Sequence, residues 1–278
     1  MDKDTQTTKD AVRDAYARIA KGGGSCCGQS SSCCGSGATN SVGSGLGYTD
    51  EELATIPAGA DMGLSCGNPF LVDSLALGET VLDLGCGGGF DIFIAALKVG
   101  ASGRVIGVDM TPDMISLARK NAAIFFDQAG LSNVDIRLGE IEHLPVADNS
   151  VDVVISNCVI NLSTDKPQVW REIVRVLKPG GRVAISDIAL LKPLPDTMRT
   201  SIEAYVGCIA GAALLEETKC MMQDSGLTSI VTRSHSNYID AMTEGSDPLY
   251  QQIIEALPKG VSIGEFVTSV TISGKKPE

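Results

Sequence analysis

The chain has 278 residues and a formal net charge of −12, because Asp and Glu number 34 and Lys and Arg only 22. Nucleic acids and anionic lipid surfaces are bound by clustered basic residues, so neither is an expected partner. The length allows one α/β domain with a smaller addition. No apolar run approaches a membrane span and the first residues lack the order of a signal peptide, so we expect a cytoplasmic protein.

Nine cysteines are unusual for such a chain. In a reducing compartment they are more often metal ligands or catalytic groups than a disulfide framework. We expect Cys86, which stands among glycines, and Cys220, which falls in a predicted helix, to be small buried hydrophobic residues. The other seven need separate interpretation.

The N-terminal region combines a helix with a low-complexity segment. Apolar residues recur at helical spacing over 10–21, which predicts one amphipathic helix. The stretch 22–45 is rich in Gly and Ser and cannot bury enough surface to order itself. It holds two vicinal pairs, Cys26-Cys27 and Cys33-Cys34, whose soft thiolates suit thiophilic ions. The alternative is a disordered linker with incidental thiols.

The segment before the first strand carries a helix cap and a cysteine. Thr49 and Glu52 have the spacing of a capping box, which predicts a short helix. Cys66 follows in a turn rich in Gly, Asn and Pro, where backbone and side chain can both reach a ligand. Because loops of this kind often carry function, Cys66 is a candidate site residue.

The stretch Thr80–Phe90, Thr-Val-Leu-Asp-Leu-Gly-Cys-Gly-Gly-Gly-Phe, has the order strand, glycine turn, helix start. Its glycines are not in the Gly-x-Gly-x-x-Gly spacing of a dinucleotide site. Asp83 would repel a pyrophosphate but can accept hydrogen bonds from a ligand ammonium, and Asp109, ending the next predicted strand, can hold ribose hydroxyls. This set resembles the class I S-adenosylmethionine-dependent methyltransferases. A dehydrogenase of the Rossmann type is the alternative.

Strands and helices continue to alternate up to residue 188. Further strands are predicted at Arg104–Met110, Val134–Gly139, Val151–Ser156 and Arg182–Ile188, and helices at Pro112–Gln128 and Gln168–Leu177. This alternation implies a Rossmann-like, doubly wound parallel sheet, in which ligands bind beyond the carboxyl ends of the strands. The residues at four such ends are therefore expected in one pocket: Asp83 with Gly85, Asp109, Glu140 to Glu142, and Asn157-Cys158.

From Pro193 the pattern changes. Helical patterns at 196–207 and 216–225 precede a strand-like alternation at 266–273. We expect 193–262 to be a helical insertion or smaller domain over the cofactor crevice. The predicted organisation is an N-terminal helix with a flexible Cys-rich segment (1–47), the cofactor-binding domain (48–192) and a smaller C-terminal helical or α+β part (193–278).

Cys66, Cys158 and Cys208 would form a trithiolate cup facing the cofactor's methyl group if the fold brings them together. Zinc sites usually employ close-spaced Cys or His pairs, whereas these three are dispersed. A trivalent metalloid prefers sulfur and keeps a lone pair that can attack a methylsulfonium without a general base. The chain has only two histidines, His143 and His235, to act as the general base that methylation of an oxygen or nitrogen acceptor needs, although Asp and Glu could substitute.

The contexts of these cysteines resemble the arsenite methyltransferases. The matching stretches are Gly63–Pro69, Asn157–Leu162 and Tyr205–Ala212, within a resemblance that runs from about Tyr48 to the C-terminus. It implies that arsenite, delivered as a conjugate of glutathione or another small thiol, binds through Cys158 and Cys208, with Cys66 as a third thiolate. The arsenic lone pair would attack the methyl carbon of S-adenosylmethionine, and the activity would serve arsenic detoxification.

The same resemblance implies redox partners and cofactor contacts. In the family a disulfide joins an N-terminal cysteine to the one matching Cys66, and thioredoxin or a small thiol reduces it. Cys33 or Cys34 is nearer to Cys66 in sequence, but the Cys26-Cys27 pair competes. The implied cofactor contacts are Asp83, Gly85 and Gly87 at the methionine end, Asp109 and Met110 at the ribose and adenine, and Ile141 and Glu142 at the adenine edge, with Glu140 as a rival for the last role.

Two other functions stay open. A methyltransferase for a small organic acceptor would use the cysteines as core, and replacing Cys158 would leave its turnover intact. A protein that sequesters thiophilic metals through Cys26–Cys34 would need neither Asp83 nor Asp109, so the presence of these carboxylates counts against it.

Overall fold

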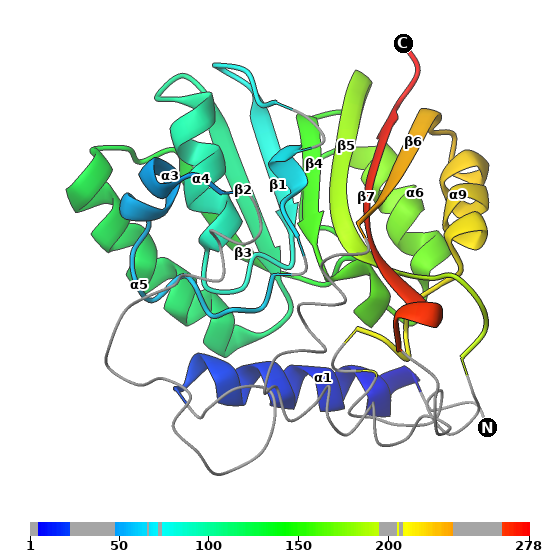
Figure 1. The fold of residues 1–278 in the computed structure, drawn as a ribbon. Helices are drawn as coiled ribbons and strands as arrows, with labels where there is room; N and C mark the ends of the chain where they lie inside the picture. The colour runs from blue at the N-terminus through cyan, green and yellow to red at the C-terminus, as the bar shows by residue number, and fades with distance from the viewer. Residues whose placement is uncertain are drawn as a thin grey trace.

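The computed structural model describes residues 5–22, 48–65, 67–71, 74–194, 205, 208–235 and 263–278. In these residues, helices flank a sheet of seven strands (Figure 1). The strands are β1 (Thr80–Leu84), β2 (Arg104–Asp109), β3 (Val134–Leu138), β4 (Val151–Asn157), β5 (Leu177–Leu190), β6 (Thr228–His235) and β7 (Val267–Lys275). The helices are α1 (Thr5–Ala20), α3 (Asp50–Ala54), α4 (Phe90–Val99), α5 (Pro112–Ala129), α6 (Lys166–Val176) and α9 (Leu215–Asp224), with short 3-10 turns η1 (Pro69–Leu71), η2 (Ile160–Leu162) and η3 (Ile263–Glu265).

The strand order across the sheet is β3-β2-β1-β4-β5-β7-β6. The first five strands in this order are parallel, and β7 runs antiparallel to both of its neighbours, β5 and β6. The registers place Leu82 of β1 between Ile106 of β2 and Val154 of β4. The prediction of a Rossmann-like, doubly wound sheet is therefore confirmed, with one reversed strand near its edge.

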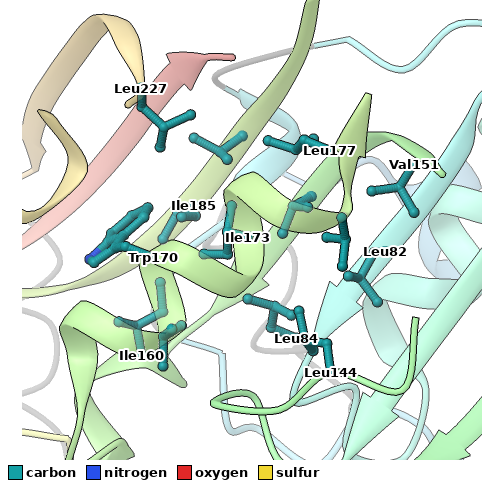
Figure 2. Packing of buried hydrophobic residues seen from close by; sticks show 14 of the residues in the cluster. Leu82, Leu84, Leu144, Val151, Ile160, Trp170, Ile173, Leu177, Ile185 and Leu227 are labelled. Carbon is teal, nitrogen blue, oxygen red and sulfur yellow. The ribbon is translucent and has the colours of Figure 1, made fainter. Parts of the chain in front are cut away.

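Both faces of the central strands are apolar, as burial between two helical layers requires. On one face, Leu82 packs in a cluster with Trp170 of α6 (Figure 2). On the other face, Val81 packs in a second cluster with Ile92 of α4 and Phe125 of α5. Adjacent residues of β1 thus belong to opposite cores, which explains why the strand reads as an apolar run rather than an alternation.

Helix α1 lies across the carboxyl ends of the parallel strands (Figure 1). Its Val12 is 1% exposed. Its Lys9 Nζ lies 2.7 Å from Glu140 Oε2 and 3.3 Å from Glu142 Oε1. The helix therefore closes the edge of the sheet at which ligands of doubly wound folds bind.

Several local predictions can be compared with the structure. The capping box is confirmed, because Glu52 N donates to Thr49 Oγ1 at 3.2 Å and Thr49 N to Glu52 Oε2 at 2.8 Å. The strand predicted at Arg182–Ile188 is longer in the structure, because β5 also includes Lys178–Gly181, at an irregularity in its register with β4. Among the described helices, none has the length and apolar character needed to cross a membrane.

The C-terminal part contributes strands to the same sheet. The late strand is confirmed as β7, whereas β6 was not predicted, because most of its residues are exposed and lack an apolar face. Cys86 is buried as expected, but Cys220 is exposed on α9, so the prediction that it is a core residue is wrong. The helix predicted over 196–207 falls outside the described residues except at Tyr205.

Candidate active site

The glycine turn after β1 brings backbone close to a cavity at the carboxyl edge of the sheet. Gly85 has a φ of 68°, and a Cβ at this position would lie 2.3 Å from Val159 Cγ2, so a side chain cannot be accommodated. Gly87 N donates a hydrogen bond to Asp109 Oδ2 at 3.0 Å. The turn is therefore tied to the carboxyl end of β2, and both reach the cavity.

The cavity collects the residues that the sequence analysis assigned to the cofactor. All seven line it: Asp83, Gly85, Gly87, Asp109, Met110, Ile141 and Glu142. Among the described lining residues Glu142 is present and its rival Glu140 is not. The Glu140 carboxylate instead pairs with Lys9 of α1, while Glu142 Oε1 accepts a hydrogen bond from Ser163 Oγ at 2.7 Å.

Three carboxyl groups line this cavity, those of the buried Asp83 and Asp91 and of the half-buried Asp109. Burial, followed by the charges of Asp91 and Asp109, raises the pKa of Asp83 well above its ordinary value. Burial raises the pKa of Asp91 to about 6, and it also raises the pKa of Asp109 against hydrogen bonds from the Thr111 and Gly87 N–H groups. These carboxyl groups favour a cationic ligand, because its positive charge would offset the cost of removing the carboxylates from water. The sulfonium and ammonium groups of S-adenosylmethionine fit this requirement.

Two of the three candidate arsenic-binding cysteines are described, and they lie together. Cys158 lines the cavity, and Cys208 Sγ donates a hydrogen bond to Cys158 O at 3.0 Å. Each is 4% exposed, with a φ of 57° for Cys158 and 63° for Cys208. Left-handed backbone at non-glycine residues is costly and concentrates at functional sites. Cys66 and the N-terminal cysteines, Cys26, Cys27, Cys33 and Cys34, lie outside the described residues.

Cys158 is disulfide-bonded in the structure. A thiolate is the form that binds a soft metal or metalloid. The disulfide at Cys158 must therefore be reduced before this sulfur can act as a ligand.

Sequence analysis did not identify two further groups at the cavity. Lys9, Val12 and Tyr16 of helix α1 line the cavity. An amphipathic pattern predicts the helix but does not show which surface of the protein the helix covers. Asp91 hydrogen-bonds with Tyr48 and Asn157. The available signal for Asp91 was a carboxylate in the first turn of an otherwise apolar helix.

The methyltransferase domain family matches residues 76–240. The chain is 44% identical to the arsenite methyltransferase of Halobacterium salinarum, over 99% of this chain and 68% of that relative. It is 39% identical to the human arsenite methyltransferase, over 52% of this chain and 40% of the human protein. This match thus covers less than half of the human relative's length.

Solved structures of methyltransferases are also similar to this chain. The crystal structure of an arsenic(III) S-adenosylmethionine methyltransferase from Chlamydomonas reinhardtii matches with a TM-score of 0.60 and 30% identity, over 87% of this chain and 75% of that one. A geranyl diphosphate methyltransferase in complex with its cofactor has the same TM-score, 0.60, at 18% identity. The shared fold therefore does not by itself distinguish the acceptor.

The prediction of S-adenosylmethionine as cofactor is confirmed. On the identity and coverage of its relatives, the chain belongs to the arsenite methyltransferase family of class I methyltransferases.

Proposed function

We propose that this chain transfers the methyl group of S-adenosylmethionine to trivalent arsenic held by cysteine thiolates. The observation that carries the proposal is that Cys158 lines the same cavity as the seven predicted cofactor residues, with Cys208 beside it. The halobacterial relative, an arsenite methyltransferase, supports the same acceptor.

The bound cofactor would supply an electrophilic methyl group on a positively charged sulfur. The task of the chain is then to hold charge and exclude water. Asp83 and Asp91 would stabilise the cationic end of the cofactor, and Asp109 would accept hydrogen bonds from its ribose. Ile141 and Glu142 would meet the adenine.

On the acceptor side, arsenite would arrive as a conjugate of glutathione or another small thiol. Exchange with the thiolates of Cys158 and Cys208, and of Cys66 as a third, would release the small thiols and form arsenic–sulfur bonds. The arsenic lone pair would then form the bond to the methyl carbon as the carbon–sulfonium bond breaks. No general base is needed, so the contribution of the chain is alignment in a dry site.

The redox balance requires thiols. Methylation takes arsenic from the trivalent to the pentavalent state, and two thiols would return the two electrons as they form a disulfide. We assign this step to Cys66 with an N-terminal cysteine, Cys33 or Cys34, and the reduction of that disulfide to thioredoxin or a small thiol. This requirement favours a cytoplasmic enzyme of arsenic detoxification.

In this proposal the three parts of the chain divide the work. Residues 1–47 carry the redox cysteines, residues 48–192 bind the cofactor, and residues 193–278 cover the acceptor and supply Cys208.

The test measures transfer of radiolabelled methyl from S-adenosylmethionine to arsenite with excess small thiol. Wild type is compared with Cys158→Ser and with Cys220→Ser, whose sulfur is exposed on α9. We expect labelled organic arsenic from wild type and Cys220→Ser, and a loss of at least about 100-fold in Cys158→Ser. Wild type that binds the cofactor but labels no arsenic would contradict the acceptor and turn the search to small organic molecules.

A further inference from the structure

A buried hydrogen-bonded group connects the cofactor cavity to the acceptor side of the site. Tyr48 Oη donates to Asp91 Oδ1 at 2.7 Å. The amide of Asn157 donates to Asp91 Oδ2 at 3.1 Å and to Gly67 O at 2.9 Å. We call Tyr48, Asp91, Asn157 and Gly67 the buried clamp.

The members of the buried clamp belong to both sides of the proposed reaction. Asp91 and Asn157 line the cavity, and Asn157 directly precedes Cys158. Gly67 directly follows Cys66 in the sequence. A Cβ on Gly67 would lie 2.1 Å from Ser186 Oγ, so its backbone packs closely against β5. One amide therefore joins a carboxylate of the cofactor cavity to the peptide next to a proposed arsenic ligand.

Tyr48 is fixed in its place without lining the cavity. Its ring meets Phe90 edge-on at 5.0 Å and Phe70 at 6.3 Å between ring centroids. The side chain is buried, and Tyr48 is not among the described residues that line the cavity, whereas its partner Asp91 is. Its hydroxyl can thus affect the site through Asp91 rather than by touching cofactor or acceptor.

We propose that Tyr48 is a positioning residue for methyl transfer, which acts through Asp91 and Asn157 to hold the Gly67 peptide and the Cys158 turn against the cofactor cavity. This inference rests on the proposed function. The alignment of a sulfur-bound acceptor with a methyl group is sensitive to displacement, and a shift of about 1 Å can cost about 100-fold in rate.

The first test is Tyr48→Phe, which removes only the hydroxyl. We expect kcat for arsenite to fall by about 10- to 100-fold, while the Kd for S-adenosylmethionine, measured by titration calorimetry, stays within about twofold. Ser225→Ala is the matched control, because it removes a hydroxyl that donates to Met222 O at 2.7 Å, at the end of α9. It should change neither quantity.

Two further readouts separate positioning from a general structural defect. If Tyr48 acts through Asn157, the double variant Tyr48→Phe with Asn157→Ala will lose little more activity than Asn157→Ala alone. The phenol lowers the pKa of Asp91, whose charge acts on the carboxyl of Asp83 and which accepts a hydrogen bond from the amide of Asn157. Its removal should therefore move the acid limb of the kcat profile to higher pH.

The outcomes are distinct. Unchanged kcat in Tyr48→Phe, or additive losses with an unmoved pH profile, would overturn the positioning role while leaving the proposed function intact. Absence of arsenite methylation by the wild type would overturn the proposed function and, with it, this inference.

Discussion

Asp187 of β5 is a buried carboxyl close to the Cys158 turn. Its Oδ1 accepts hydrogen bonds from Asn161 Nδ2 and from Ile188 N, both at 2.8 Å. Its Oδ2 has no hydrogen-bond partner in the described part of the chain. Burial, partly offset by the Ile188 N–H and by the charge of Lys166, raises the pKa of Asp187 to about 7. The ionised form is therefore less favourable in the folded chain than in the unfolded one.

The sign of the resulting pH dependence follows from this raised pKa. Between about pH 4 and 7 the unfolded chain releases the Asp187 proton while the folded chain keeps it, so this group lowers stability as pH rises. Asp187→Asn keeps the Oδ1 acceptor and cannot ionise. We expect its free energy of unfolding, relative to wild type, to increase from pH 4 to 7 and then level off. The difference between 3.8 and about 7 corresponds to about 4 kcal/mol at most. Denaturant titrations of both proteins from pH 4 to 7 measure these free energies of unfolding. A difference between the two proteins that does not change with pH would contradict the raised pKa of Asp187.

The residues of the site divide into those that the sequence could predict and those that it could not. Asp83, the glycines and Asp109 form a local strand–turn–helix–strand pattern, so spacing alone indicated their cavity. Tyr48 bonds to Asp91, 43 positions away, and Asn157 bonds to Asp91 across 66 positions. No local pattern records such pairings, because they depend on how the strand ends meet in space.

At the scale of elements, α1 is attached to the cavity by charge as well as by apolar burial. The Lys9 hydrogen bond, opposed by burial, holds the pKa of Glu140 below its ordinary value. The Lys9 side chain is 14% exposed, whereas that of Lys21, which pairs with Asp113 at 3.1 Å near the other end of the helix, is 66% exposed. An ion pair stabilises more where water is excluded, so Lys9 should contribute more than Lys21 to holding the helix in place.

This contrast predicts the behaviour of two lysine variants, one within α1 and one directly after it. Lys9→Met removes the cation that joins the helix to Glu140 and Glu142, and we expect the Kd for S-adenosylmethionine to rise about fivefold, which corresponds to about 1 kcal/mol. Lys21→Met should leave the Kd unchanged. Calorimetric titrations at low and high salt give the measurement, and the wild-type affinity should weaken with salt more than that of Lys9→Met. Equal Kd values for the two variants would show that α1 is held by its apolar face alone.

The contrast between predicted and unpredicted elements has a physical cause. The strands β1, β2 and β4 are buried on both faces, so their apolar runs were visible in the sequence, and β7 was visible as an alternation of apolar and polar residues. β6 is an edge strand with mostly exposed residues, and its composition resembles that of a loop. The helical period predicted α1, but the surface that it covers depends on the finished sheet.

At the scale of the molecule, the C-terminal strands are continuous with the cofactor-binding sheet. β7 lies between β5 and β6 and pairs with β5 from Arg182 opposite Lys275 to Leu190 opposite Val267. Val270 and Ile272 of β7 belong to the same buried cluster as Leu82 of β1. All the predicted cofactor residues nevertheless precede residue 193. The part of the chain that binds the cofactor is therefore shorter than the part that folds as one unit.

This arrangement predicts the behaviour of a chain that ends at residue 192. Its cofactor residues would all be present, but it would expose the buried edge of β5 and lose the apolar side chains of β7. An unpaired, apolar strand edge promotes association with other chains, so we expect aggregation and no cooperative thermal unfolding by circular dichroism. A chain shortened only by Pro277 and Glu278 is the control and should unfold cooperatively. If the 192-residue chain folds cooperatively and binds S-adenosylmethionine, the region from residue 193 onward is a separate cover rather than part of the folding unit.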